Sequence, residues 1–169
     1  MTTALLIARL LLGGTLFAHG AQKLFGWFGG YGIKGTGGFM ESLGFRPGSL
    51  FAVAAGLGEV GGGLLTALGL GGPIGPALIV MVMIVAILSV HIGNGFWASK
   101  NGYELNTMNI AAALTLAFVG FGGLSLDAAF GITNVWSDAG RWIVVGAAIL
   151  LALGNMAVRR TAHTAQPTA

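Results

Sequence analysis

The sequence predicts an all-α integral membrane protein, a polytopic bundle of four helices followed by a fifth at the C-terminal side. Three observations lead to this fold class. Of 169 residues, 55% are hydrophobic and 8% are charged, whereas soluble domains carry roughly 25% charged residues. Several apolar runs approach the length of about 20 residues that a helix needs to cross a bilayer. The 31 glycines follow no collagen-like period, and glycine is typical of closely packed membrane helices.

The apolar runs predict one membrane domain over residues 1–160 and a disordered tail over residues 161–169. Membrane spans are expected at about residues 3–25, 49–70, 75–98, 107–124 and 140–158. The second span ends at Gly71-Gly72-Pro73, and Pro76 suits the first turn of the third.

A glycine-rich connection, residues 26–48, joins the first two spans. Within it, Phe39, Met40 and Leu43 fall on one side of a short helix, which predicts a helix lying on the membrane surface. The aromatic residues Trp27 and Tyr31 before this helix suit the headgroup region of a bilayer.

Basic residues are unevenly divided between the two ends of a five-span bundle. One end receives Lys23, Lys34, Arg46, Lys100, Arg159 and Arg160, and the other only Arg9 and Arg141. Because Lys and Arg accumulate on the cytoplasmic side, we expect a multi-pass cell-membrane protein whose N-terminus is outside and whose C-terminus is cytoplasmic. The same bias accounts for the net charge of +3, so we expect no nucleic-acid partner.

The sequence contains no cysteine. Disulfides, iron–sulfur clusters and cysteine-ligated metals are thereby excluded within this chain, and no metal site is expected. Any redox role must therefore use a bound organic cofactor, a haem or a partner subunit.

Glu59 lies near the middle of the second span, where an ionisable residue costs about 2.5–3.5 kcal/mol on insertion scales. Small residues surround it on the helix surface, so a neighbouring helix or a ligand is expected to fill the space beside it. Gly58 and Gly62 add a small-residue stripe that predicts close helix contact. The structural alternative is that Glu59 only pairs with Lys23, His19 or a backbone group. We predict Glu59 and His91 as the catalytic residues.

Polar residues from three separate helices and their connections are expected to reach one membrane level, with Glu59 somewhat deeper. The predicted binding residues of this group are His19, Lys23, Asn94, Glu104 and Asn109. Together with His91 they predict a polar pocket that opens toward the cytoplasmic leaflet. The alternative is a hydrogen-bond network that only holds the bundle together.

Arg9 near the outer end of the first span and Asp127 after the fourth lie at the same end of the predicted bundle. We predict that they form a structural ion pair.

Several motifs in this order resemble the DoxX family of small bacterial and archaeal membrane proteins. They are Arg9, Gly13, His19-Gly20-Ala21-Gln22-Lys23-Leu24-Phe25-Gly26, Glu59-Val60-Gly61-Gly62-Gly63, His91, Asn94-Gly95-Phe96-Trp97, Gly102-Tyr103-Glu104, Asn109 and Gly123-Leu124-Ser125-Leu126-Asp127. The resemblance covers about residues 5–127, and the span over 140–158 exceeds the four helices typical of the family.

The resemblance implies a link to quinones, because the family takes its name from subunits associated with quinol oxidase and thiosulfate:quinone oxidoreductase, and related members are connected with oxidative stress. The functional candidates that it carries onto this sequence are Arg9, Lys23, Glu59, His91, Glu104 and Asn109.

The first hypothesis is a quinone-linked redox protein that uses menaquinone or ubiquinone, alone or as a subunit of an oxidoreductase. Lys23 and His91 would donate hydrogen bonds, Glu59 would relay a proton, and the isoprenoid tail would lie along the glycine-rich face of the second span. Lipid, quinone and either a protein that supplies electrons or a second copy of the chain are the expected partners. A variant has haem b held by His19 and His91.

Two alternatives belong to other functional classes. The first is a non-catalytic membrane anchor or scaffold that recruits a partner enzyme through the loop at residues 26–48. The second is a carrier of small molecules or lipids with Glu59 in the path.

Overall fold

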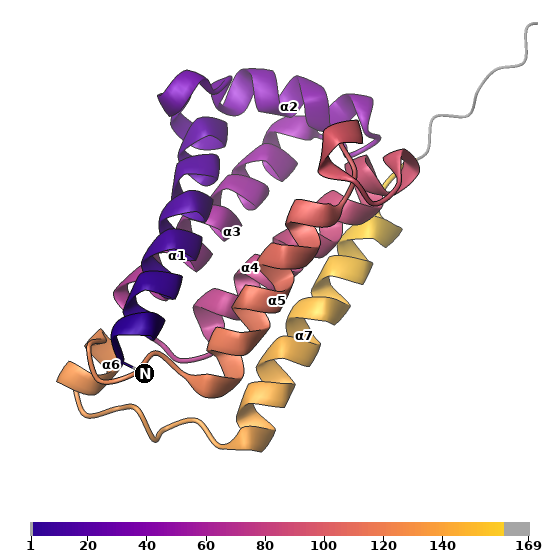
Figure 1. Cartoon of the computed structure of the whole chain (residues 1–169). Helices are drawn as coiled ribbons and strands as arrows, with labels where there is room; N and C mark the ends of the chain where they lie inside the picture. Colours follow the sequence, from indigo (N-terminus) through magenta and orange to yellow (C-terminus); the bar gives the residue numbers. More distant parts are fainter. Residues whose placement is uncertain (1, 161–169) are drawn as a thin grey trace, which may run out of the picture.

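The computed structural model describes residues 2–160, and every regular element in that range is helical (Figure 1). Four helices are long and apolar enough to cross a membrane: α1 (Thr2–Phe25), α3 (Gly48–Leu68), the helix that begins as α4 (Ile74–Ala86) and continues to Asn94, and α7 (Asp138–Ala157). The predicted all-α multi-pass bundle with a C-terminal membrane helix is confirmed. The tail predicted at 161–169 lies outside the described residues.

The remaining helices are shorter. α5 (Glu104–Val119) has 16 residues and extends over about 24 Å, less than the roughly 30 Å of a hydrocarbon core. The others are α2 (Gly32–Ser42), α6 (Leu126–Ala129), η1 (Trp27–Gly29), η2 (Ile87–His91), η3 (Ile92–Asn94) and η4 (Ala98–Lys100).

Two helix ends differ from the predicted spans because a glycine takes a conformation that other residues rarely adopt. α5 stops at Val119 instead of residue 124, since Gly120 has φ 85°. The helix after α4 stops at Asn94 instead of residue 98, since Gly95 has φ 77°. Hydropathy continues past both points, so the apolar run overestimates each helix.

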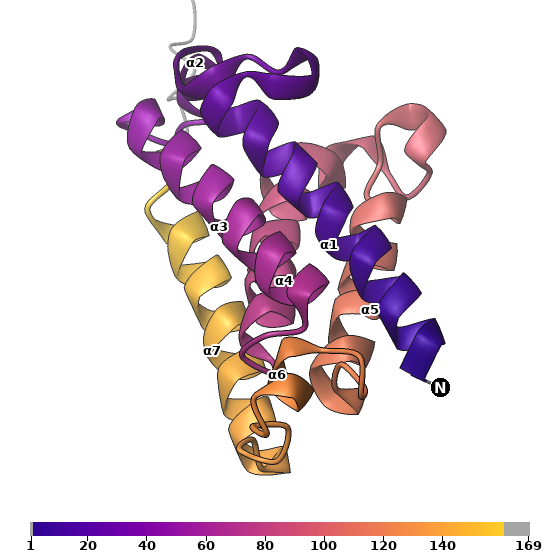
Figure 2. The ribbon, with the colours of Figure 1, turned by 90° about the vertical axis from the view of Figure 1, so that its left-hand side faces the viewer.

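The long helices alternate in direction, and α2 lies across one end of the bundle (Figures 1 and 2). We refer to the two ends as the α2 end and the α6 end. α4 is central, since it packs against α3, α5 and α7, while α1 packs chiefly against α3. The core between α1, α4 and α5 contains Leu12, Leu16, Ile79, Val80, Val82, Met83, Ala113 and Leu116.

Glycines allow α1 and α3 to approach closely. A Cβ on Gly13 would lie 2.5 Å from the Gly63 carbonyl oxygen, and a Cβ on Gly20 would lie 2.7 Å from the Gly56 carbonyl oxygen. A Cβ on Gly63 would likewise lie 2.6 Å from the Gly13 carbonyl oxygen. All three distances are too short for any side chain, so backbone packs directly on backbone and the register of the two helices is fixed.

The stripe of Gly58 and Gly62 makes the predicted close helix contact, with α4 as the neighbour. A Cβ on Gly58 would lie 2.8 Å from Val82, and one on Gly62 would lie 3.1 Å from the Gly75 carbonyl oxygen. α3 is therefore packed through glycine on two faces, one against α1 and one against α4.

Gly13→Ala is expected to destabilise the bundle, because its methyl group must push α1 and α3 apart. Overpacking of this kind costs about 1–3 kcal/mol, which thermal unfolding of the detergent-solubilised protein would detect as a lower midpoint. Gly14→Ala is the matched control, since nothing lies within 4 Å of a Cβ at that position. Equal midpoints for the two variants would contradict the direct backbone contact.

Candidate functional site

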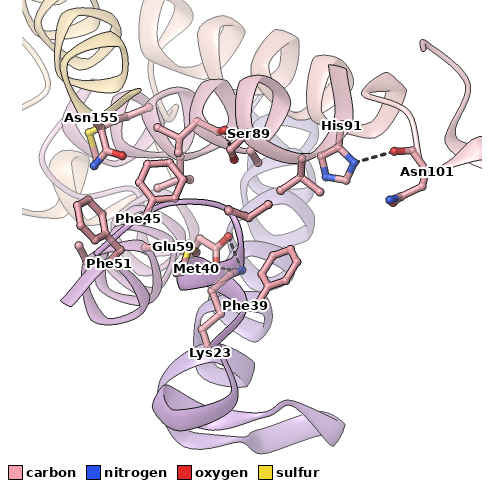
Figure 3. Close-up of a pocket in the computed structure, with 18 residues that line it drawn as sticks. Lys23, Phe39, Met40, Phe45, Phe51, Glu59, Ser89, His91, Asn101 and Asn155 are labelled. Carbon is pink, nitrogen blue, oxygen red and sulfur yellow. Dashed lines mark hydrogen bonds and ion pairs between the residues drawn. The ribbon is translucent and has the colours of Figure 1, made fainter. Parts of the chain in front are cut away.

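A pocket of about 440 Å³ lies near the α2 end of the bundle. Its walls are mainly apolar, from α2, α3 and α4, and the connection after α2 adds Leu43 and Phe45. Six polar residues interrupt these walls: Lys23, Glu59, Ser89, His91, Asn101 and Asn155. Figure 3 shows these side chains around one cavity, with contributions from α1, α3, the end of α4 and α7.

Lys23 and Glu59 form an ion pair in this pocket. Lys23 Nζ donates to Glu59 Oε1 at 2.8 Å and to Oε2 at 2.5 Å. Glu59 is buried, whereas the Lys23 side chain retains 27% exposure. It is the one salt bridge within residues 2–160, and it gives the carboxylate the partner that a buried charge requires.

The direction of helical side chains explains how these two residues meet. The contacts of Gly13 with Gly63 and of Gly20 with Gly56 place Lys23 about 9 Å along the bundle axis from Glu59, at about 1.5 Å per residue. Side chains on a helix lean toward its own N-terminus. Because α1 and α3 are antiparallel, Lys23 leans toward Glu59 and Glu59 leans toward Lys23.

The opposite wall comes from a π-helical turn, Ile87–His91, in which the Ile92 amide donates to the Ile87 carbonyl five residues earlier. This turn supplies Ser89, Val90 and His91 to the pocket. π-helical turns inside α-helices occur frequently at functional sites. The wider turn redirects side chains that a continuous α4 would present elsewhere.

The His91 ring is held by the connection that follows it. Nδ1 lies 2.8 Å from the Asn101 carbonyl oxygen. A carbonyl only accepts, so Nδ1 carries the proton and Nε2 is the accepting nitrogen of the neutral ring. In Figure 3, Nδ1 is turned toward Asn101, and the other ring nitrogen lies on the side of the cavity.

The pocket reaches the outside of the bundle. Phe39 and Ala54 both line it and are both exposed, Phe39 to 50%. In a membrane, these positions face lipid or the interface, so an amphiphilic molecule has a lateral route into the cavity.

Asn155 on α7 is a pocket residue that the sequence analysis missed. It is polar but not ionisable and is the third residue from the end of α7, so the rule that singled out Glu59, the cost of an ionisable group at mid-span, does not apply to it. Ser89 and Asn101 were missed as well. Ser89 Oγ donates to the Val85 carbonyl at 2.6 Å, a common arrangement for serine in membrane helices, and Asn101 belongs to a connection outside the spans.

Two predicted binding residues, His19 and Asn94, lie toward the α2 end, as the pocket does, but do not line it. His19 is exposed, and its Nδ1 lies 3.2 Å from Gln22 Oε1 on its own helix. Asn94 is also exposed, and its amide donates to the carbonyls of Val90 and Asn101. Of the two predicted histidines, only His91 faces the cavity.

Glu104 and Asn109 serve other contacts. Glu104 Oε2 accepts from the Ala98 amide at 2.9 Å, which closes the connection between η4 and α5. Asn109 Nδ2 points to Met83 Sδ at 3.7 Å, between α5 and α4. The predicted group therefore divides: Lys23, Glu59 and His91 share the pocket, and His19, Asn94, Glu104 and Asn109 lie around it.

Arg9 and Asp127 lie at the α6 end as expected but do not form the predicted ion pair. The Arg9 guanidinium donates to the Leu124 carbonyl. Asp127 accepts from the amides of Gly71 and Gly72, each at 2.8 Å. Two adjacent backbone amides after α3 satisfy the carboxylate, whereas a carbonyl before α6 accepts from one Arg9 nitrogen and leaves the buried Nε and Nη1 without a partner within residues 2–160. The two residues thus tie α1, the turn before α4 and α6 together through backbone.

The helical spans and the polar groups buried among them define a multi-pass integral membrane protein. Comparison with known protein families matches residues 4–92, more than half of the chain, to the DoxX family, and the chain belongs to that family. The matched region contains α1 to α4 and most of the pocket, including Lys23, Glu59 and His91. No curated protein and no solved structure matches the chain significantly.

Breaking the Lys23–Glu59 pair from either side is expected to destabilise the protein, and Lys23→Gln is expected to cost at least as much as Glu59→Gln, because it leaves the more deeply buried charge unpaired. The double variant should cost less than the sum of the two, with a coupling energy of about 1–3 kcal/mol, because each single change leaves a charge without its partner. Unfolding of the four proteins under identical detergent conditions measures this cycle. Strict additivity would mean that the pair contributes nothing.

Proposed function

We propose that the protein is a quinone-linked redox protein of the cell membrane, acting alone or as the membrane subunit of an oxidoreductase complex. One observation carries this proposal: the Lys23–Glu59 pair and His91 face a single, mainly apolar cavity of about 440 Å³. Ligand pockets are commonly apolar with a few well-placed polar groups. A menaquinone or ubiquinone headgroup, a planar ring with two oxygens, suits that chemistry.

A bound quinol releases two electrons and two protons on oxidation, and quinone reduction takes up both. Nε2 of neutral His91 can accept one proton, since Nδ1 is committed to the Asn101 carbonyl. The Glu59 carboxylate can accept the other, and the adjacent Lys23 ammonium supplies a hydrogen-bond donor. The chain has no cysteine, so we propose that a partner protein exchanges the two electrons.

The route of the isoprenoid tail must differ from the one expected from sequence. The glycine faces of α3 are packed against α1 and α4, which leaves no room for a chain there. Exposed Phe39 and Ala54 at the edge of the pocket offer the alternative exit. The proposed tail therefore leaves the cavity laterally into lipid.

The arrangement favours a quinone over haem b. Bis-imidazole ligation by His19 and His91 would need both rings in one cavity. His19 instead lies outside the pocket with Gln22 as its neighbour. An absorption spectrum of the purified protein with a Soret band would reverse this preference.

Glu59→Gln and His91→Ala are each expected to lower quinone-dependent turnover by about 100-fold or more, since general acid–base groups contribute about 10²–10⁴-fold. Quinone extracted from purified wild-type protein should be stoichiometric by mass spectrometry. Turnover is measured in membranes that contain the electron-donating partner.

His19→Ala is the matched control for His91→Ala, because it removes the same side chain from outside the pocket. It should leave turnover and quinone content close to wild type. Turnover that survives Glu59→Gln and His91→Ala, but is lost when the loop at residues 26–48 is altered, would replace the proposal with a scaffold. Substrate flux through liposomes containing the chain alone would replace it with a carrier.

For orientation, we propose that the α2 end faces the cytoplasm. Lys34 lies in α2, Arg46 in the connection after it, Lys100 at the end of η4 and Arg159 after α7, all at the same end, while Arg141 lies in the first turn of α7 at the other. This distribution follows the cytoplasmic preference of basic residues.

The absence of cysteine allows a direct test of orientation. Lys34→Cys and Asn134→Cys lie in exposed segments at the α2 end and the α6 end, respectively. On intact cells, a membrane-impermeant maleimide should label Asn134→Cys and should label Lys34→Cys only after the membrane is permeabilised. The reverse pattern would invert the proposed topology.

A further inference from the structure

A second pocket of about 430 Å³ lies at the α2 end, beside the connection between α2 and α3. Three arginines from distant parts of the sequence line it: Arg46 from that connection, and Arg159 and Arg160 from the segment after α7. The remaining lining residues are Glu41, Ser42, Leu43 and Gly44. The site shares only Leu43 with the proposed quinone pocket.

Backbone contacts hold the two arginine-bearing segments together. The Arg160 amide donates to the Gly44 carbonyl at 2.9 Å. Arg159 Nε donates to the Leu43 carbonyl at 2.6 Å, and its guanidinium lies 6.0 Å from the centre of the Phe45 ring. Arg159 is thus oriented by the protein, and it retains N–H groups that these contacts do not use.

The positive charge of this pocket is not neutralised by carboxylates of the described chain. Glu41, the one acidic lining residue, uses Oε1 to accept from the Gly48 amide at 3.1 Å. Within residues 2–160 no salt bridge involves any of the three arginines. Three guanidinium groups against one carboxylate leave an excess of positive charge around one concave site, which favours an anionic ligand.

The chemistry and position of the site indicate a phosphate group. Guanidinium matches phosphate oxygens with parallel N–H donors. α2 crosses the end of the bundle (Figure 2), and exposed Trp27, Phe28, Tyr31 and Phe39 are in or beside it. Such aromatic residues settle at the headgroup level of a bilayer, which places the arginines where lipid phosphates are.

We propose that Arg46, Arg159 and Arg160 form a phosphate-binding site at the membrane surface. The phosphodiester of an anionic lipid and free inorganic phosphate present the same chemistry, and the lipid has the higher local concentration. This site is independent of what the first pocket binds. Its occupancy would fasten the end of α7 to the connection after α2.

The test is native mass spectrometry of the full-length protein released from detergent after titration with phosphatidylglycerol or phosphatidylcholine. Wild-type protein should retain phosphatidylglycerol preferentially. Arg46→Gln should weaken phosphatidylglycerol binding by about five- to tenfold, the loss expected for one charge-assisted contact, and leave phosphatidylcholine binding unchanged. Arg46 is exposed and makes no hydrogen bond with its side chain in the described chain, so the variant should fold.

Lys100→Gln is the matched control, because it removes an exposed positive charge at the same end but outside the pocket. It should leave binding of both lipids unchanged. Inorganic phosphate that displaces phosphatidylglycerol from wild-type protein identifies a site that also takes the free anion. Binding that is sensitive to Arg46→Gln but not to phosphate identifies the lipid headgroup. Equal retention of both lipids by wild type, or equal losses in Arg46→Gln and Lys100→Gln, would overturn the proposal.

Discussion

The direct contact of backbone with backbone between α1 and α3 sets the geometry of everything at the α2 end. Gly13 and Gly20 on one helix, and Gly56 and Gly63 on the other, leave no side chain to adjust the separation or to allow sliding. The register is therefore fixed, and with it the axial offset that Lys23 and Glu59 bridge by leaning toward each other. A shift of one helical turn, about 5.4 Å, would leave a carboxylate buried without its ammonium partner.

The packing of α3 against α1 and α4 determines both where the pocket lies and how deeply the charge of Glu59 is buried. The glycine faces of α3 bring α1 and α4 close, yet Ala54 and Ala55 lie on the part of α3 where neither helix fills the space. Glu59 lies at the boundary between the packed and open regions, so its charge is buried by helices on one side and accessible to a ligand on the other. Phe45, which is buried, lines the pocket and packs against Phe51, with the two ring planes tilted by 41°.

Much of this architecture is predictable because membrane spans depend on local composition. The apolar runs located α1, α3, α4 and α7, and the cost of an intramembrane carboxylate directed attention to Glu59. Residues in the connections were harder: the partners of Glu104 and Asn94 are backbone groups of their own neighbourhood, which hydropathy cannot anticipate. The prediction of an Arg9–Asp127 ion pair was wrong for the same reason. The backbone amides of Gly71 and Gly72 bind the Asp127 carboxylate in place of Arg9, and the sequence does not show that these amides are available. The π-helical turn has no compositional signature, so the orientation of His91 could come only from coordinates.

That turn has an evolutionary consequence. A π-helical turn contains one residue more than the α-helical path it replaces, so deletion of a single residue within Ile87–His91 would restore a regular α-helix. The helix on both sides of the turn, including Ile79, Val80 and Met83 in the core, would keep its place because the turn alone absorbs the extra residue. Only the side chains inside the turn would take new directions. Gain or loss of one codon can thus change which groups face this cavity without redesigning the bundle.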